Sequence, residues 1–281
     1  MAEITVAQIK ELRDRTGCGM MDAKRALTEA GGDVEKAIDD LRKKGEVKAA
    51  KKAGRETAEG KIGIKVEGNV AAVVAVKCET DFTANNDEFK GLVDNIAKAI
   101  HAAEGEASEL KYPAGGTVGD AVKALVAKTG ENMQIGAYRR LTVDNGYFGY
   151  YLHSDGKLGV VVKIEGGDGS SDAEKTLAKD IAMHAAATNP LGLTQADVPA
   201  DVVAREREIA LEQAKQSGKP ANIQEKIAEG KVAAFFKEQT LLAQPFVKDT
   251  AVTIEQHVAN VGKQVNKPLK LTQYARIKVG E

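Results

Sequence analysis

Apolar side chains recur at helical spacing through the first 45 residues, and glycines interrupt the pattern twice. The pattern predicts a first helix after a Thr5 cap and a third helix after an Asp33 cap. Between them, a second predicted helix carries Met20 and Met21 and stops at Gly31-Gly32. Helices this short are not stable separately, so they must share one small core. We therefore predict a compact three-helix domain, in whose core the two methionines most simply belong.

Farther along, two pairs of short apolar runs are each joined by a turn that contains glycine or asparagine. The first pair and its turn are 62–67, Gly68-Asn69 and 70–77, and the second are 147–153, Asp155-Gly156 and 158–165. Each pair predicts a β-hairpin, and each is followed by a segment with apolar residues at helical spacing. Between the two units, residues 118–128 predict another helix with Val122 and Leu125 buried. We expect an α+β core in which helices cover one face of each sheet.

Residues 199–236 carry few apolar positions, enough for a narrow seam between two antiparallel helices. The seam positions are Val202, Val203, Ile209, Leu211, Ile223, Ile227, Val232 and Phe235. They predict a projecting helical hairpin that turns at Ser217-Gly218-Lys219-Pro220. After a further helix at about 253–261, apolar alternation from Leu269 to Val279 predicts a half-buried strand.

Length and charge limit the classes of partner. The 281 residues include 40 basic and 41 acidic side chains, so a net charge of −1 gives no overall attraction to nucleic acid or anionic membranes. No apolar segment approaches the roughly 18 residues of a membrane span, and Met1-Ala2-Glu3 does not begin a signal peptide. We expect a cytoplasmic protein without membrane association, whose cysteines, Cys18 and Cys78, are reduced thiols.

Seven basic residues and one acidic residue lie between Arg42 and Arg55. This composition favours a solvated linker whose first part prolongs the third helix. An open alternative is a ribosome- or nucleic-acid-associated module that uses Lys48, Lys51 and Lys52. Such a role would require aromatic residues or a second basic face nearby, and the sequence indicates neither. A second alternative is a ubiquitin-type interaction adaptor built on the three-helix domain.

The residue types of catalytic and metal sites are present, but their spacing does not suit either. His101, His153, His184 and His257 are widely separated, and neither cysteine belongs to a Cys-x-x-Cys motif. We assign His184 a structural role on a helix face against the sheet. Residues 166–169 come nearest to a phosphate-binding loop, but their acidic and serine neighbours would repel phosphate. We therefore predict no metal, no cofactor and no enzymatic activity, and expect the protein to work by binding.

Phe82 is the strongest candidate for contact with a partner. It follows the predicted strand 70–77 in the segment Cys78-Glu79-Thr80-Asp81-Phe82-Thr83, in a chain with only 4% aromatic residues. Two interpretations stay open. Thr80 or Asp81 could cap a following helix, with Phe82 folded back as a hydrophobic staple on its first turn. Alternatively, the ring projects from a loop on a rigid scaffold to contact another molecule.

Several longer motifs occur in a set order along the chain. They are Leu12 to Lys24, Cys78 to Phe82, Gly130-Glu131-Asn132, Ile181 to Ala186, Ser217-Gly218-Lys219-Pro220 and Gln244-Pro245-Phe246-Val247. With these motifs the chain resembles the bacterial elongation factor Ts family over essentially its whole length. The resemblance implies an N-terminal domain like the ubiquitin-associated (UBA) domain, a duplicated α+β core, a coiled-coil arm and a C-terminal strand module.

The resemblance also implies domain limits. They are 1–54 for the three-helix domain with its basic linker, 55–144 for one core subdomain, 145–198 with 237–262 for the other, 199–236 for the arm, and 263–281 for the C-terminal module. Some family members dimerise through the arm, so a homodimer through 199–236 is possible.

The implied function is guanine-nucleotide exchange on elongation factor Tu, bound in its GDP and nucleotide-free forms, without direct contact to nucleic acid. In the family, the segment that matches Thr80, Asp81, Phe82 and Thr83 is linked to dislodging Mg²⁺ from the GTPase. Further candidate contacts are Met20, Met21, Lys24, Thr129, Gly130 and His153. The chain departs from the family pattern at Lys77, often Asn, at Thr83, usually Val, and at Thr129, often aliphatic.

Overall fold

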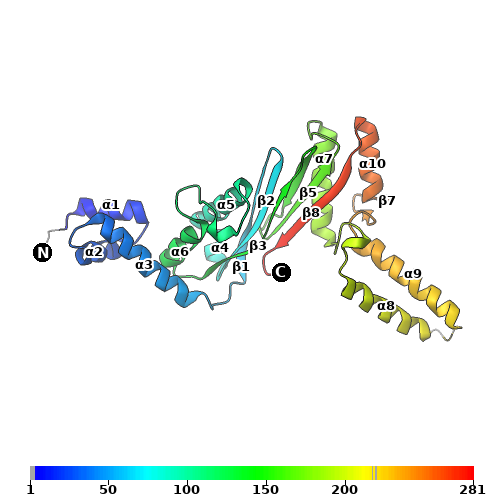
Figure 1. Cartoon of the computed structure of the whole chain (residues 1–281), viewed down its shortest axis with the longest axis horizontal. Helices are drawn as coiled ribbons and strands as arrows, with labels where there is room; N and C mark the ends of the chain where they lie inside the picture. The colour runs from blue at the N-terminus through cyan, green and yellow to red at the C-terminus, as the bar shows by residue number, and fades with distance from the viewer. Residues whose placement is uncertain (1–3, 217, 219) are drawn as a thin grey trace.

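Three groups of elements follow one another along the long axis of the molecule (Figure 1). The computed structural model describes residues 4–216, 218 and 220–281, apart from the side chains of residues 46 and 48. N-terminal helices come first, two sheets with their helices form the middle, and a helical pair projects at the far end. Mixed helices and small antiparallel sheets agree with the expected α+β class.

The first group contains α1 (Val6–Thr16), α2 (Met20–Glu29) and α3 (Val34–Lys52). Both predicted caps are present, because Thr5 Oγ1 accepts from the Gln8 N–H and the Asp33 carboxylate accepts from the Lys36 N–H. The shared core consists of Leu12, Ala23, Ala26, Leu27, Ala30 and Ala37. On α2, the buried positions are Ala23, Ala26 and Leu27.

The two methionines are not part of this core, contrary to the expectation from their spacing. Met20 is 56% exposed and Met21 is 78% exposed. They lie at the N-terminal end of α2, whereas its buried face is formed by Ala23, Ala26 and Leu27 farther along the helix. Two large apolar side chains are therefore left on the surface.

The basic run 42–55 is a docked helix for most of its length rather than a free linker. As predicted, it prolongs α3, which reaches Lys52 and packs along α6 (Val118–Thr129). Arg42 lies 2.8 Å from the Asp120 carboxylate on α6, and Lys52 Nζ donates to the Gly130 carbonyl. The sequence pattern missed this because the contacts join residues nearly eighty positions apart.

Each predicted hairpin is present and gains a third strand from elsewhere in the chain. The first sheet has the order β1 (Glu59–Glu67), β2 (Val70–Cys78), β3 (Met133–Thr142), and the second has the order β4 (Gly146–Leu152), β5 (Leu158–Glu165), β8 (Lys270–Lys278). All four pairings are antiparallel. The sequence predicted β8 but not β3, an edge strand that buries Met133 and Leu141 and leaves its middle half-exposed or exposed.

Helices cover one face of each sheet, as predicted, and the other faces pack against one another. On the first sheet lie α5 (Asp87–Ala102) and α6, and on the second lie α7 (Asp172–Thr188) and α10 (Ile254–Val265). Val122 of α6 is buried, but Leu125 is only partly so, and Val126 completes the face. Between the sheets, Ile62 and Val73 of one meet Val161 and Ile277 of the other. The two sheets therefore share a single apolar layer.

The projecting pair is α8 (Ala200–Lys215) and α9 (Ala221–Gln239), which pack on each other (Figure 1). Residues 217 and 219 of the expected turn lie outside the described residues. The expected seam is correct in part, since Val202, Val203, Leu211, Ile227, Val232 and Phe235 are half-buried. The fully buried positions are Ala210, Ala214 and Ala228, which the sequence pattern did not predict. Ile209 and Ile223 are exposed instead. Alanines at the contact allow two helices to approach closely.

The chain returns from α9 through the two short strands β6 (Pro245–Phe246) and β7 (Asp249–Thr253). His184 of α7 is fully buried against this returning segment rather than against the sheet. Its Nδ1 accepts from the Val247 N–H, so Nε2 carries the proton and donates to Gln244 Oε1 at 2.8 Å. Burial lowers the pKa of His184, which keeps the ring neutral. The predicted structural role of this histidine is confirmed.

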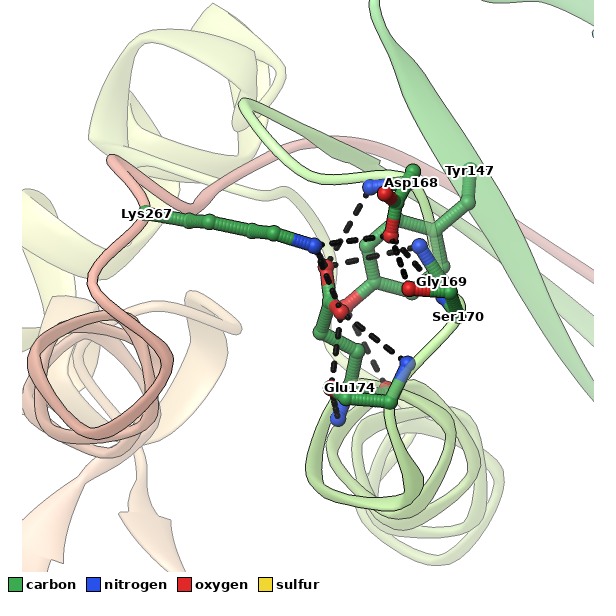
Figure 2. Close-up of polar contacts among 7 residues, drawn as sticks. Tyr147, Asp168, Gly169, Ser170, Glu174 and Lys267 are labelled. Atoms are coloured by element: carbon green, nitrogen blue, oxygen red, sulfur yellow. Dashed lines mark hydrogen bonds and ion pairs between the residues drawn. The ribbon is translucent and has the colours of Figure 1, made fainter.

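The glycine loop after β5 is closed by a carboxylate of the protein itself (Figure 2). Backbone N–H groups of Asp168 and Gly169 donate to Glu174 Oε1, and the Ser171 hydroxyl donates to Glu174 Oε2 at 2.7 Å. Lys267 lies 3.0 Å from the same carboxylate. Burial alone would raise the pKa of Glu174, but the hydrogen bonds of Ser171 and Lys267 outweigh it and lower that pKa. The loop therefore stabilises the fold, and the amides of residues 168–171 are bonded to carboxylates of the protein rather than open to a phosphate.

Glutamine at position 174 would keep the shape of the side chain and remove its charge. We expect Glu174→Gln to lower the free energy of unfolding by about 1–3 kcal/mol at neutral pH, as for other hydrogen bonds to charged groups. Because folding lowers the pKa of Glu174 from 4.5, the stabilisation is complete above that pH. It is lost as the pH falls through the lowered folded-state value. Urea denaturation of the unmodified protein and the variant, from neutral pH to below 4.5, measures the difference in their free energies of unfolding. This difference should become smaller in acid. A difference that stays constant with pH would contradict the assigned role of the Glu174 charge.

Candidate partner-binding site

Phe82 lies on α4 (Asp81–Asn85), a five-residue helix that begins three residues after β2 ends. Thr80 caps this helix, and its hydroxyl accepts from the Thr83 N–H at 3.3 Å. The inner face of α4 consists of Thr83 and Ala84, both buried, and Ala84 belongs to the core under the first sheet. The backbone beneath Phe82 is therefore fixed on one side by packing.

The Phe82 side chain is 86% exposed and points away from this core. Of the two interpretations of the segment, the cap is correct and the staple is wrong, since the ring does not fold back on its own helix. The reason is geometric: Thr83 and Ala84 take the inward positions of α4, and the residue before them faces outward. A large ring is thus held at the surface on a buried support.

Glu131 holds the start of α4 from the opposite side of the turn. Its two carboxylate oxygens accept from the Thr80 N–H at 3.1 Å and from the Thr80 hydroxyl at 2.7 Å. The neighbouring Glu79 carboxylate accepts from the Asn132 N–H at 2.5 Å. The turn between β2 and α4 is therefore bound twice to the segment that follows α6.

The turn of the second hairpin lies on the same side of the molecule as α4. Gly156 accepts from the Ile62 N–H of β1 at 2.7 Å, which ties this turn to the first sheet. The nearby Glu59 carboxylate, with weaker contributions from Asp155 and Asp81, raises the pKa of Lys157. His153 is half exposed in this turn, with Nδ1 3.0 Å from Asp155 Oδ1. The structure thus places the turn that carries His153 beside the start of β1, which pairs with the end of β2 just before the Phe82 segment.

The other candidate residues fall into two places. Thr129 ends α6, where its hydroxyl donates to the Leu125 carbonyl at 2.9 Å, and Gly130 follows it with a φ of +79°. Both adjoin Glu131 and so lie near the Phe82 turn. Met20, Met21 and Lys24 are all exposed on α2, whose first turn lines a groove together with Lys128 of α6.

Comparison with known proteins assigns the chain to a family. Residues 79–281 match the family model described as Elongation factor TS. Curated proteins named Elongation factor Ts are 47% identical in Bartonella bacilliformis and 46% in Clostridium kluyveri, each alignment covering 99% of this chain and 93% of the relative. The protein from Xanthobacter autotrophicus is 45% identical, with 100% and 94% covered. The chain belongs to the elongation factor Ts family.

For this elongation factor Ts family member, the structure places the positions at which the sequence analysis expects departures from the family pattern. Thr83 is buried in the inner face of α4, under the turn. Thr129 is exposed with its hydroxyl bonded to its own helix, so it offers little apolar surface. Lys77 is half-buried on β2.

Sequence reasoning missed the supporting roles of Glu79, Glu131 and Asn132, although all three lie in motifs that carried the family resemblance. Their contacts join residues about fifty positions apart, which no local pattern reveals. The signal that could have found them is a carboxylate and an amide clustered directly after a helix-ending glycine.

Other chemistry is not indicated within the described residues. No group of three or more His, Cys, Asp and Glu side chains there could hold a metal ion. No described helix is long and apolar enough to cross a membrane. Burial raises the pKa of the Cys78 thiol to about 12, which makes it a poor nucleophile.

Two phenylalanines on successive helices allow a direct test of how the ring is used. Phe82 is 86% exposed, whereas Phe89 on α5 is 1% exposed. We expect Phe82→Ala to change the free energy of unfolding by about 0.5 kcal/mol or less. Phe89→Ala should cost about 3–5 kcal/mol because it leaves a core cavity. Urea denaturation of the two variants gives both values, and a comparable loss in each would mean that Phe82 serves the protein's own stability.

Proposed function

We propose that this chain is a guanine-nucleotide exchange factor for elongation factor Tu. It binds the GDP-bound GTPase, promotes release of GDP, and remains on the nucleotide-free form until GTP loads, as translation elongation requires. The observation that carries the proposal is the exposed Phe82 ring on a fixed turn in a member of the elongation factor Ts family. A ring in this position cannot contribute to the core, so its use lies in contact with another molecule.

The mechanism works on the metal and phosphate site of the partner. GTPases hold the nucleotide through a phosphate-binding loop and a Mg²⁺ ion that bridges phosphate oxygens. Phe82 inserts between two helices of the nucleotide domain and shifts the one that supports the metal-binding loop. Asp81, exposed beside it, disturbs the polar contacts there. Loss of the metal contacts then weakens the binding of GDP to the GTPase.

One ring does not supply the whole effect. Burying a phenylalanine contributes about 1.5–3 kcal/mol, which is about one to two powers of ten in an equilibrium constant. The remaining stabilisation of the loosened GTPase comes from separate contacts. Met20, Met21 and Lys24 on α2 are one such surface, His153 in the second hairpin turn is another, and β8 is a third.

The finer architectural assignments belong to the same proposal. The three N-terminal helices form a UBA-like domain, the chain divides at the expected domain limits, and the protein works in the cytoplasm. The arm 199–236 is a coiled coil that can mediate a homodimer. Support for this last role comes from Ile209 and Ile223, which are exposed on the arm rather than used in its seam.

The competing functions are less well supported. A groove of about 650 Å³ between α2, α3 and α6 does combine basic residues from both sides. However, Arg15 pairs with Glu35, Arg42 with Asp120 and Lys44 with Glu29, so much of the positive charge is already compensated. Among the described lining residues there is no aromatic ring on which a base could stack. An adaptor acting through residues 1–54 alone would leave Phe82 without a role.

Release of labelled GDP from elongation factor Tu tests the proposal directly. We expect Phe82→Ala to lower the stimulated release rate by about 10- to 100-fold, the scale set by burial of one phenylalanine. Asp81→Ala should have a smaller effect, because it removes polar contacts and leaves the ring. Stopped-flow fluorescence measures both rates.

A matched control is Leu191→Ala, which removes an exposed apolar side chain between α7 and α8. It should leave the release rate unchanged. Full activity of Phe82→Ala, or an equal loss in the Leu191 variant, would remove the basis for the proposed mechanism.

Binding of the two ligands to elongation factor Tu must also be coupled reciprocally. If this protein lowers the affinity of the GTPase for GDP by a given factor, GDP must lower the affinity for this protein by the same factor. Equilibrium titrations with and without GDP, with Mg²⁺ held constant, measure both factors. With Phe82→Ala, both factors should decrease, and they should stay equal to one another. A change in only one of them would exclude the linked mechanism.

A further inference from the structure

We propose that Glu131 and Asn132 are positioning residues that fix the direction of Phe82 relative to the N-terminal helices. The inference rests on the proposed exchange function, because it concerns how two partner-contacting surfaces are held. Neither residue needs to touch the partner. Both act through the turn before α4 and through the residues that follow α3.

Glu131 controls where α4 begins. A five-residue helix is not stable by itself, so its placement depends on its cap and on the burial of Thr83 and Ala84. The cap residue, Thr80, donates both its N–H and its hydroxyl to Glu131 while its hydroxyl oxygen accepts from the Thr83 N–H. Without the carboxylate, the hydroxyl is free to rotate and the Thr80 N–H loses its acceptor. Phe82, two residues after the cap, would then lose its fixed direction.

Asn132 joins the same turn to the N-terminal helices. It is only 3% exposed, and its side-chain amide donates to the carbonyls of Arg55 at 2.7 Å and Ala53 at 3.3 Å. Gln134 donates to the Ala53 carbonyl as well, at 3.2 Å. Since Ala53 directly follows α3, these bonds hold the end of that helix against the segment after α6.

The two residues are adjacent, so one dipeptide fixes both surfaces. The Asn132 N–H donates to Glu79, immediately before the Thr80 cap, which closes the connection within the turn itself. Preorganised surfaces bind with a smaller loss of conformational freedom than independently moving ones. A partner that contacts α2 and Phe82 together therefore meets them at a set separation.

A tryptophan reporter tests the role of Glu131 without elongation factor Tu. The chain contains no tryptophan, so Phe82→Trp places a single probe on the turn. We expect its fluorescence anisotropy to fall when Glu131→Ala is added, and to fall less with Glu131→Gln, which keeps one acceptor oxygen. Glu104→Ala is the control, since that exposed carboxylate pairs with Arg140, away from the turn. Thermal denaturation of each variant confirms folding. Unchanged anisotropy in the Glu131→Ala protein overturns the proposal.

A double-mutant cycle tests the same role in exchange. Glu131→Ala should slow stimulated GDP release about tenfold, as expected for lost hydrogen bonds to a carboxylate. In a Phe82→Ala background the same change should matter less than about twofold, because there is no ring left to position. Equal losses in both backgrounds would show that Glu131 acts independently of Phe82 and would overturn the proposal. If the unmodified protein does not accelerate release, the exchange function fails, while the anisotropy result still decides the positioning role.

The Asn132 contact has its own readout. Asn132→Ala removes the side-chain donor to the Arg55 carbonyl, so trypsin should cleave after Arg55 faster in the full-length variant than in the unmodified protein. Mass spectrometry identifies the cut, and Glu131→Ala should not accelerate it. Cleavage after Arg55 at the original rate in the Asn132 variant would overturn this half of the proposal.

Discussion

An exposed ring can be presented in one direction only if the backbone beneath it is buried and hydrogen-bonded. Phe82 meets this condition because its neighbours Thr83 and Ala84 pack inward and the Thr80 cap is held by Glu131. The first sheet and α5 supply the core on which this support rests. The ring itself contributes almost nothing to that core, so the packing that supports the ring does not depend on the ring.

In both hairpin-and-helix units a carboxylate holds the turn that follows the hairpin, but only one of the two turns leaves an exposed surface. After β2 and after β5 the chain leaves a sheet through polar residues, and in each case a carboxylate accepts from backbone N–H groups of the turn. In the second unit, Glu174 comes from the following helix, is fully buried and pairs with Lys267, so the loop closes on itself (Figure 2). In the first, Glu131 comes from outside the turn and leaves the outer side of α4 free. The turn of the second unit is therefore closed by the protein's own side chains, whereas the first unit leaves the outer side of α4 exposed.

Local chemistry predicted much of the fold, because caps, turns and alternation depend on neighbouring residues. Thr5, Asp33 and the alternation of β8 all have the predicted roles. Features that depend on distant partners were missed or misjudged. The edge strand β3 carries Arg139 and Arg140 in place of apolar alternation, and α2 buries Ala23, Ala26 and Leu27 rather than Met20 and Met21. In the arm, the fully buried positions are alanines that the pattern did not predict. Within the site, sequence identified the exposed residue but not the carboxylate that holds it.

Two kinds of polar contact join the N-terminal helices to the core: exposed ion pairs and buried hydrogen bonds. The two kinds differ in how strongly they fix the orientation of these helices. Exposed ion pairs such as Arg42 with Asp120 lose in side-chain freedom and solvation much of what they gain in attraction. The amide of Asn132 is buried, and leaving it without its acceptors would cost more than forming the contact gains. Beside the packing of α3 along α6, the hydrogen bonds at Ala53 and Arg55 therefore contribute more to the orientation than the exposed ion pairs do. These bonds lie next to the Phe82 turn, because the Asn132 N–H also donates to Glu79 directly before the Thr80 cap.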